Sequence, residues 1–111
     1  MTNQLVSDAD VEKALDWLRD SADEIGNAKR EAVKTEHMIR HVKALAMKLH
    51  MELPVSAQER EAYASDQYLM AIERAADAAG EFERLKSLRG AAELKIEAWR
   101  SMGANYRAMK L

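Results

Sequence analysis

The 111-residue chain has no cysteine, one proline and four glycines. Without cysteine, it can form neither a disulfide-bonded scaffold nor a cysteine–zinc module. With so few prolines and glycines, the chain has few of the residues that form the turns of a strand-rich fold. Alanine, leucine, lysine, arginine and glutamate predominate instead, as they do in long helices. The composition therefore predicts an all-α protein.

Long apolar runs are also missing. None approaches the roughly 18 residues that a membrane-spanning helix requires, and no basic and apolar segment of the secretory type stands at the start of the sequence. We expect a cytoplasmic protein with no membrane partner. There is no P-loop, no G-x-S-x-G turn and no glycine-rich dinucleotide turn, so we expect neither an enzyme nor a bound cofactor.

The charged residues form four blocks of alternating sign. Residues 1–25 and 57–83 each contain two bases and seven acids, whereas residues 26–56 contain six bases and three acids and residues 84–111 contain seven bases and two acids. If the chain folds back in its middle, each acidic block lies beside a basic one. The charge pattern predicts a long antiparallel helical hairpin of the coiled-coil type.

The first helix of this hairpin has recognisable ends. Ser7 and Asp8 precede the first apolar periodicity and suit a helix N-terminus. Pro54 disfavours helical conformation at Leu53 and lacks a backbone donor. We therefore expect one helix over 8–52.

The second helix follows a short turn at 53–56. Ser56 and Glu59 match the S-x-x-E pattern of a capping box. A helix over 57–108 is expected to start there, which makes residues 1–111 a single helical-hairpin domain.

Apolar residues spaced by three and four predict the interior seam of the hairpin. On the first helix its members are Val11, Leu15, Leu18, Ala22, Ile25, Ala28, Ala32, Thr35, Ile39, Val42, Ala46 and Leu49. On the second helix they are Ser65, Leu69, Ile72, Ala76, Ala79, Phe82, Leu85, Arg89, Ala92, Ile96, Trp99, Gly103 and Tyr106. Each series has one extra step of three, at Gly26 and at Gly80, where we expect a local overwinding or bend. The register predicts Val11 beside Ile96.

Two large polar or aromatic side chains have expected places in this register. Trp17 would face Gly90 and lie flat on it, and a tryptophan that binds a partner is the alternative. Arg89 would extend its guanidinium towards Asp20 or Glu93, because an unpaired buried charge is too costly.

A second apolar stripe remains once the seam is filled. We assign to a self-association or partner-binding surface Met38, Met47, Met51, Met70, Ala71, Ala75, Ala78, Leu88, Ala91 and Leu94. The alanines permit close helix approach and the methionines adapt to varied contacts. A homo-oligomer is expected, with a dimer that closes a four-helix bundle as the favoured form. A groove for a different protein is the alternative, and both uses are compatible.

Two histidines have the spacing of metal ligands. His37 and His41 are four residues apart, as zinc ligands on one helix face are, and Asp66 would lie opposite His41. The adjacent glutamate and third histidine of known hydrolase motifs are missing. Exposed histidines without metal are the preferred interpretation.

The C-terminal segment offers an alternative function in nucleic-acid binding. Lys95, Arg100, Arg107 and Lys110 form a basic zone with Trp99 interleaved. The opposing interpretation is that acidic blocks across the hairpin neutralise this zone, in a chain whose isoelectric point is about 5.9.

Two segments carry a resemblance to known proteins. Residues 96–108, IEAWRSMGANYRA, and residues 61–68, EAYASDQY, resemble those of small helical proteins encoded by bacteriophages and prophages. This resemblance implies a phage accessory role beside replication or recombination proteins and supplies no catalytic residues. We expect a non-enzymatic scaffold, adaptor or inhibitor that self-associates and binds a protein partner. The alternative is a nucleic-acid-binding accessory protein.

Overall fold

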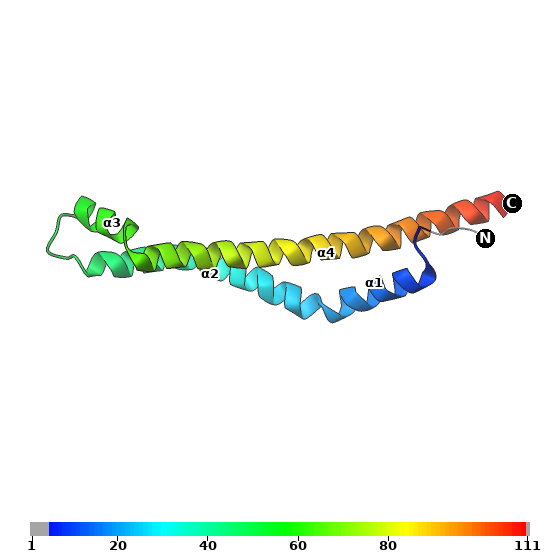
Figure 1. Cartoon of the computed structure of the whole chain (residues 1–111), viewed down its shortest axis with the longest axis horizontal. Coiled ribbons are helices and arrows are strands. Elements are labelled where there is room, and N and C mark those ends of the chain that lie inside the picture. Colours follow the sequence, from blue (N-terminus) through cyan, green and yellow to red (C-terminus); the bar gives the residue numbers. More distant parts are fainter. Residues whose placement is uncertain (1–4, 111) are drawn as a thin grey trace. The chain divides into compact units, whose positions relative to one another are not determined.

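The computed structural model describes residues 5–110, with the side chain of Lys110 excepted. Their helices are α1 (Asp8–Asp20), α2 (Ala22–Lys48), α3 (Val55–Tyr63) and α4 (Asp66–Lys110), and the described part contains no strand (Figure 1). This confirms the all-α prediction. None of these helices is both long and apolar enough to cross a lipid bilayer.

The chain divides into two compact units. We call the first the terminal unit; it joins the residues up to Ile25 with those from Arg84 onwards. The second, the central unit, comprises Gly26–Glu83. In the terminal unit α1 packs against the last part of α4, and in the central unit α2 packs against α3 and the first part of α4, in the antiparallel sense expected of a helical hairpin.

Helix α1 begins where the sequence predicts. The Ser7 Oγ accepts a hydrogen bond from the Asp10 amide at 3.1 Å, and the Asp10 carboxylate accepts one from the Ser7 amide at 3.0 Å. This reciprocal pair satisfies two amides that the first turn leaves without helical partners. The hydrogen bond from the Ser7 backbone, the largest cause, lowers the pKa of Asp10 below its ordinary value.

The expected single helix over 8–52 is wrong, because the structure interrupts it at Ser21. The Ser21 amide donates to the Trp17 carbonyl at 2.9 Å and the Ser21 carbonyl accepts from the Ile25 amide at 2.9 Å. Helical hydrogen bonds thus continue on both sides, but Ser21 has ψ −2°, far from the helical value of about −42°. The irregularity was expected at Gly26, which lies inside α2.

The second expected helix, over 57–108, is also divided. Helix α3 begins at Val55, one residue before the expected capping serine Ser56, and no side chain caps it. After Tyr63 the chain leaves the helix, and the Ser65 Oγ accepts a hydrogen bond from the Tyr68 amide at 3.2 Å. Ser65 therefore caps α4, and the connection between α2 and α4 includes a short helix of its own.

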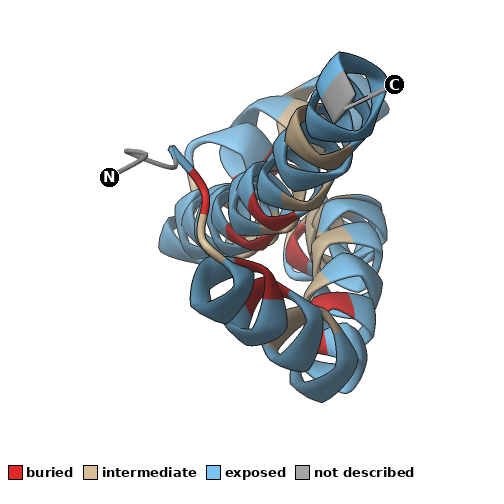
Figure 2. Ribbon diagram, turned by 90° about the vertical axis from the view of Figure 1, so that its right-hand side faces the viewer, coloured by how far each residue is buried: buried red, intermediate tan, exposed pale blue. Residues whose placement is uncertain are grey.

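Buried and half-buried positions follow an unbroken alternation of three and four along two rows, which we call the inner rows. On α1 and α2 the inner row consists of Val11, Ala14, Leu18, Ser21, Ile25, Ala28, Ala32, Thr35, Ile39, Val42 and Ala46. On α4 it consists of Tyr68, Ala71, Ala75, Ala78, Phe82, Leu85, Arg89, Ala92 and Ile96. Figure 2 shows the buried residues as isolated positions on helices whose other residues are of intermediate burial or exposed. The extra steps predicted at Gly26 and Gly80 are therefore wrong.

Small residues replace larger ones at several inner-row positions. Leu15, Leu69 and Ile72 were expected inside, yet their exposed fractions are 52%, 54% and 42%. Their neighbours Ala14 and Ala71, at 6% and 8%, are buried instead. The distance between packed helices depends on the side chains at the contact, so alanines allow the arms to approach closely. Bulky apolar side chains remain on the outside.

Candidate functional site

A groove lies between α2 and α4 in the central unit, and we call it the α2/α4 groove. It has a volume of about 570 Å³ and is lined by Val42, Leu45, Ala46, Lys48, Leu49, Gln67, Met70, Ala71 and Arg74. The buried Ala46 and Ala71 form its floor. Leu45, Leu49 and Met70 are 50%, 71% and 49% exposed. The groove therefore offers bulky apolar side chains to a binding partner.

The charged residues of the α2/α4 groove all have one sign. Lys48 comes from α2 and Arg74 from α4, and no carboxylate belongs to the lining. Within the described part of the chain, neither cation forms an ion pair. An apolar floor between two cationic walls suits an anionic, apolar surface.

Contacts of Lys43 hold helix α3 against α2 beside this groove. The Lys43 ammonium donates to the Tyr63 hydroxyl at 2.8 Å, lies 4.5 Å from the centre of that ring and is 4.0 Å from the Glu59 carboxylate. The Tyr63 and Tyr68 rings meet edge to face at 5.2 Å. The hydrogen bond to the Tyr63 hydroxyl, the largest cause, raises the pKa of Lys43. These contacts connect three helices of the central unit.

The predicted association surface is only partly available. Met38, Met51 and Met70 are exposed and Met47 is half-buried, but Met70 is the one methionine that lines the α2/α4 groove. The three predicted alanines are less accessible than expected. Ala71 is buried on the floor of the α2/α4 groove, and Ala75 and Ala78 are half-buried in the inner row of α4. Sequence periodicity missed this because the larger Leu69 and Ile72 offered an equally regular series.

A smaller cleft lies in the terminal unit. It has a volume of about 310 Å³ and is lined by Asp10, Lys13, Ala14, Trp17, Leu88, Ala91, Ala92 and Lys95. Leu88 and Ala91 were predicted surface residues and are exposed here, as is Leu94 outside the cleft. Trp17 does not lie on Gly90, because a Cβ atom added to that glycine would meet nothing within 4 Å. The indole borders the cleft instead.

The basic C-terminal residues mostly contact their own surroundings. Arg100 pairs with Glu97 at 3.6 Å, and the Arg107 Nη1 lies 3.6 Å from the position of a Cβ on Gly103. The Trp99 indole N–H donates to the Asp8 carboxylate at 2.7 Å, which agrees with the predicted pairing of Val11 and Ile96. Lys95 is exposed beside the cleft, and the side chain of Lys110 lies outside the described residues. Arg100 and Arg107 line one cleft together with Trp99.

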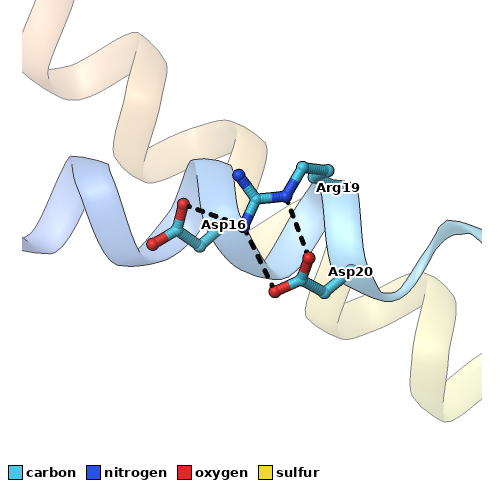
Figure 3. Close-up of polar contacts among 3 residues, drawn as sticks. All are labelled: Asp16, Arg19 and Asp20. Carbon is cyan, nitrogen blue, oxygen red and sulfur yellow. Dashed lines mark hydrogen bonds and ion pairs between the residues drawn. The ribbon is translucent and has the colours of Figure 1, made fainter.

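Exposed ion pairs on α1 join residues of the same helix. Figure 3 shows Arg19 between Asp16 and Asp20, with N–O distances of 3.4 Å and 2.9 Å. The Arg19 hydrogen bond, the largest cause, lowers the pKa of Asp20. Arg89 was expected to reach Asp20 or Glu93, but within the described chain it forms no ion pair with either. Arg19 engages Asp20 instead.

The two histidines considered as metal ligands, His37 and His41, are exposed on α2. Over the described residues, no three histidine, aspartate or glutamate side chains gather closely enough to hold a metal ion.

Comparison of the chain with models of protein families, with curated proteins and with solved structures finds no match.

Proposed function

We propose that this chain is a non-enzymatic helical scaffold, adaptor or inhibitor that self-associates and binds a protein partner. The observation that supports self-association is an exposed stripe on α4 within the central unit, which we call the α4 stripe. It consists of Leu69, Ile72, Ala76 and Ala79, all exposed and spaced by three, four and three. A row of this spacing lies on one face of a helix and normally packs against another helix.

The α4 stripe is complementary to itself. If two copies of α4 cross in antiparallel orientation about a two-fold axis, Leu69 of one copy lies opposite Ala79 of the other and Ile72 lies opposite Ala76. Each bulky side chain then meets an alanine, so the two surfaces interlock without overpacking. Two-fold contacts of this kind are the commonest in soluble oligomers. The self-complementarity favours a dimer.

Light scattering tests this function. The wild-type chain is expected to show about twice the 12.5 kDa mass of one copy. Leu69→Glu is expected to restore the single-copy mass, because it places a carboxylate in an apolar contact. Met109→Glu provides the matched control, since Met109 is 85% exposed on the same helix and outside the stripe.

A wild-type mass of one copy at every concentration would contradict self-association. A Leu69→Glu variant that keeps the dimer mass would remove the α4 stripe from the interface. Circular dichroism establishes that each variant remains helical.

A further inference from the structure

The α2/α4 groove differs from the α4 stripe in both shape and charge. Leu45 lies on α2, Leu49 lies in the turn directly after α2 and Met70 lies on α4, above a floor of Ala46 and Ala71. The stripe pairs each bulky residue with an alanine of a second copy, whereas the groove has bulky residues on both walls. It therefore requires an occupant that places apolar side chains down its middle.

The charges of the groove restrict that occupant further. Lys48 and Arg74 stand on opposite walls, and every other lining residue is uncharged. Neither cation has an ion-pair partner within the described residues. A ligand that carries carboxylates along both edges of an apolar stripe would pair with both cations, and one with basic edges would be repelled.

We propose that the α2/α4 groove binds an amphipathic helix of a different protein, with apolar residues at positions i and i+4 and acidic residues on both sides of them. A helix seated in an apolar groove is a recurring mode of peptide recognition. The inference rests on the proposed function, for which it specifies the partner. The groove residues anchor the apolar face, and Lys48 and Arg74 select acidic helices over basic ones.

Fluorescence anisotropy with two synthetic peptides tests this assignment. The first is a fluorescein-labelled helical peptide with leucines at i, i+4 and i+8 and glutamates on both flanks. The second has lysine at every glutamate position. The wild-type protein is expected to bind the acidic peptide at least about tenfold more tightly at low salt, and added salt should weaken this binding.

Charge-reversed variants locate the binding site. Lys48→Glu combined with Arg74→Glu is expected to weaken binding of the acidic peptide by about tenfold or more and to favour the basic peptide. The matched control is Lys13→Glu combined with Lys95→Glu, which reverses the two cations of the cleft in the terminal unit. This control is expected to leave binding unchanged. All four positions are exposed or at the rim, and circular dichroism shows whether each variant keeps its helices.

Three results would overturn the assignment. The first is equal binding of both peptides by the wild type, and the second is unchanged binding of the acidic peptide by the Lys48→Glu, Arg74→Glu variant. The third is a loss of the dimer mass in that variant without peptide binding in the wild type, which would assign the groove to a second copy of this chain. Failure of self-association is recognised separately, from the wild-type mass and the Leu69→Glu variant.

Discussion

The Ser21 side chain is buried at the junction of α1 and α2, with an exposed fraction of 4%. Its Oγ has no hydrogen-bond partner among the described residues. A buried hydroxyl without a partner has lost its hydrogen bonds to water and received none in return. Ser21 thus occupies an inner-row position that suits a small apolar residue.

Ser21→Ala is therefore expected to raise the free energy of unfolding by about 1 kcal/mol. Chemical denaturation measures this change. Ser87→Ala is the matched control, because Ser87 is exposed on α4 and the same substitution there changes only the helix propensity. A Ser21→Ala effect no larger than that of the control would show that the buried hydroxyl carries no penalty.

Asp10 makes the start of α1 sensitive to pH. The hydrogen bond from the Ser7 amide lowers the pKa of Asp10 in the folded protein. The carboxylate therefore stabilises the fold above its unfolded pKa, about 3.9, and this contribution disappears as the pH falls through the lower folded pKa. Asp10→Asn is expected to lower Tm at pH 7, with little difference from wild type at about pH 2. A Tm difference that does not change with pH would argue against a role for the Asp10 charge.

At the scale of the helices, periodicity predicted which faces are apolar but not which of two neighbouring rows is buried. Leu15 and Ala14 are both apolar and adjacent, and so are Ile72 and Ala71. A seam assigned to the bulkier residue of each pair contains Leu15 and Ile72, but the structure buries Ala14 and Ala71. Close approach of the helix backbones has the greater effect on packing here, and pairwise sequence spacing contains no information about it.

The inner row of α4 can be tested by enlarging one residue. Ala92 is 7% exposed, and Ala92→Leu is expected to lower the free energy of unfolding by about 1–3 kcal/mol through overpacking. Ala98 is exposed on the same helix, and Ala98→Leu should change stability by less than about 0.5 kcal/mol. Thermal or denaturant unfolding compares the two. Equal effects would mean that Ala92 does not lie in a closely packed row.

The helix ends show a similar limit. Ser7 was placed at the start of α1 because it precedes the first apolar periodicity, and the structure adds its reciprocal hydrogen bonds with Asp10. The S-x-x-E pattern at Ser56 was misleading, since the helix already begins at Val55 after Pro54. The cap of the long helix is Ser65. Its signal was the following Asp66, an acid in the first turn, but without the structure two nearby serines competed for one helix start.

At the scale of the whole molecule, composition and charge blocks were sufficient to predict an all-α chain with antiparallel arms. They were not sufficient for the candidate surfaces. Met70 and Ala71 were predicted at a surface and line the α2/α4 groove, but Lys48, Leu49 and Arg74 were not among the predicted surface residues. Which of these side chains are exposed depends on which row of each helix is buried. A prediction that shifts the inner row by one position therefore assigns exposed residues to the interior and buried residues to the surface.

The choice of buried row also determines which residues a second copy of the chain would contact. Self-association through the α4 stripe requires the bulky residues outside the inner rows to contact a second copy, with Ile72 of one α4 opposite Ala76 of the other. The chain has no cysteine, so single cysteines can report this contact without removal of native thiols. A disulfide forms readily only when the two Cβ atoms are about 3.5–4.5 Å apart.

The most direct measurement is oxidative cross-linking of mixed variants, read by mass spectrometry of the intact products. A mixture of Ile72→Cys and Ala76→Cys is expected to give mainly the mixed covalent dimer. Ala75→Cys, on the inner row beside them, is expected to give little cross-linking with either variant. Abundant cross-linking through Ala75→Cys, with none between Ile72→Cys and Ala76→Cys, would contradict the account.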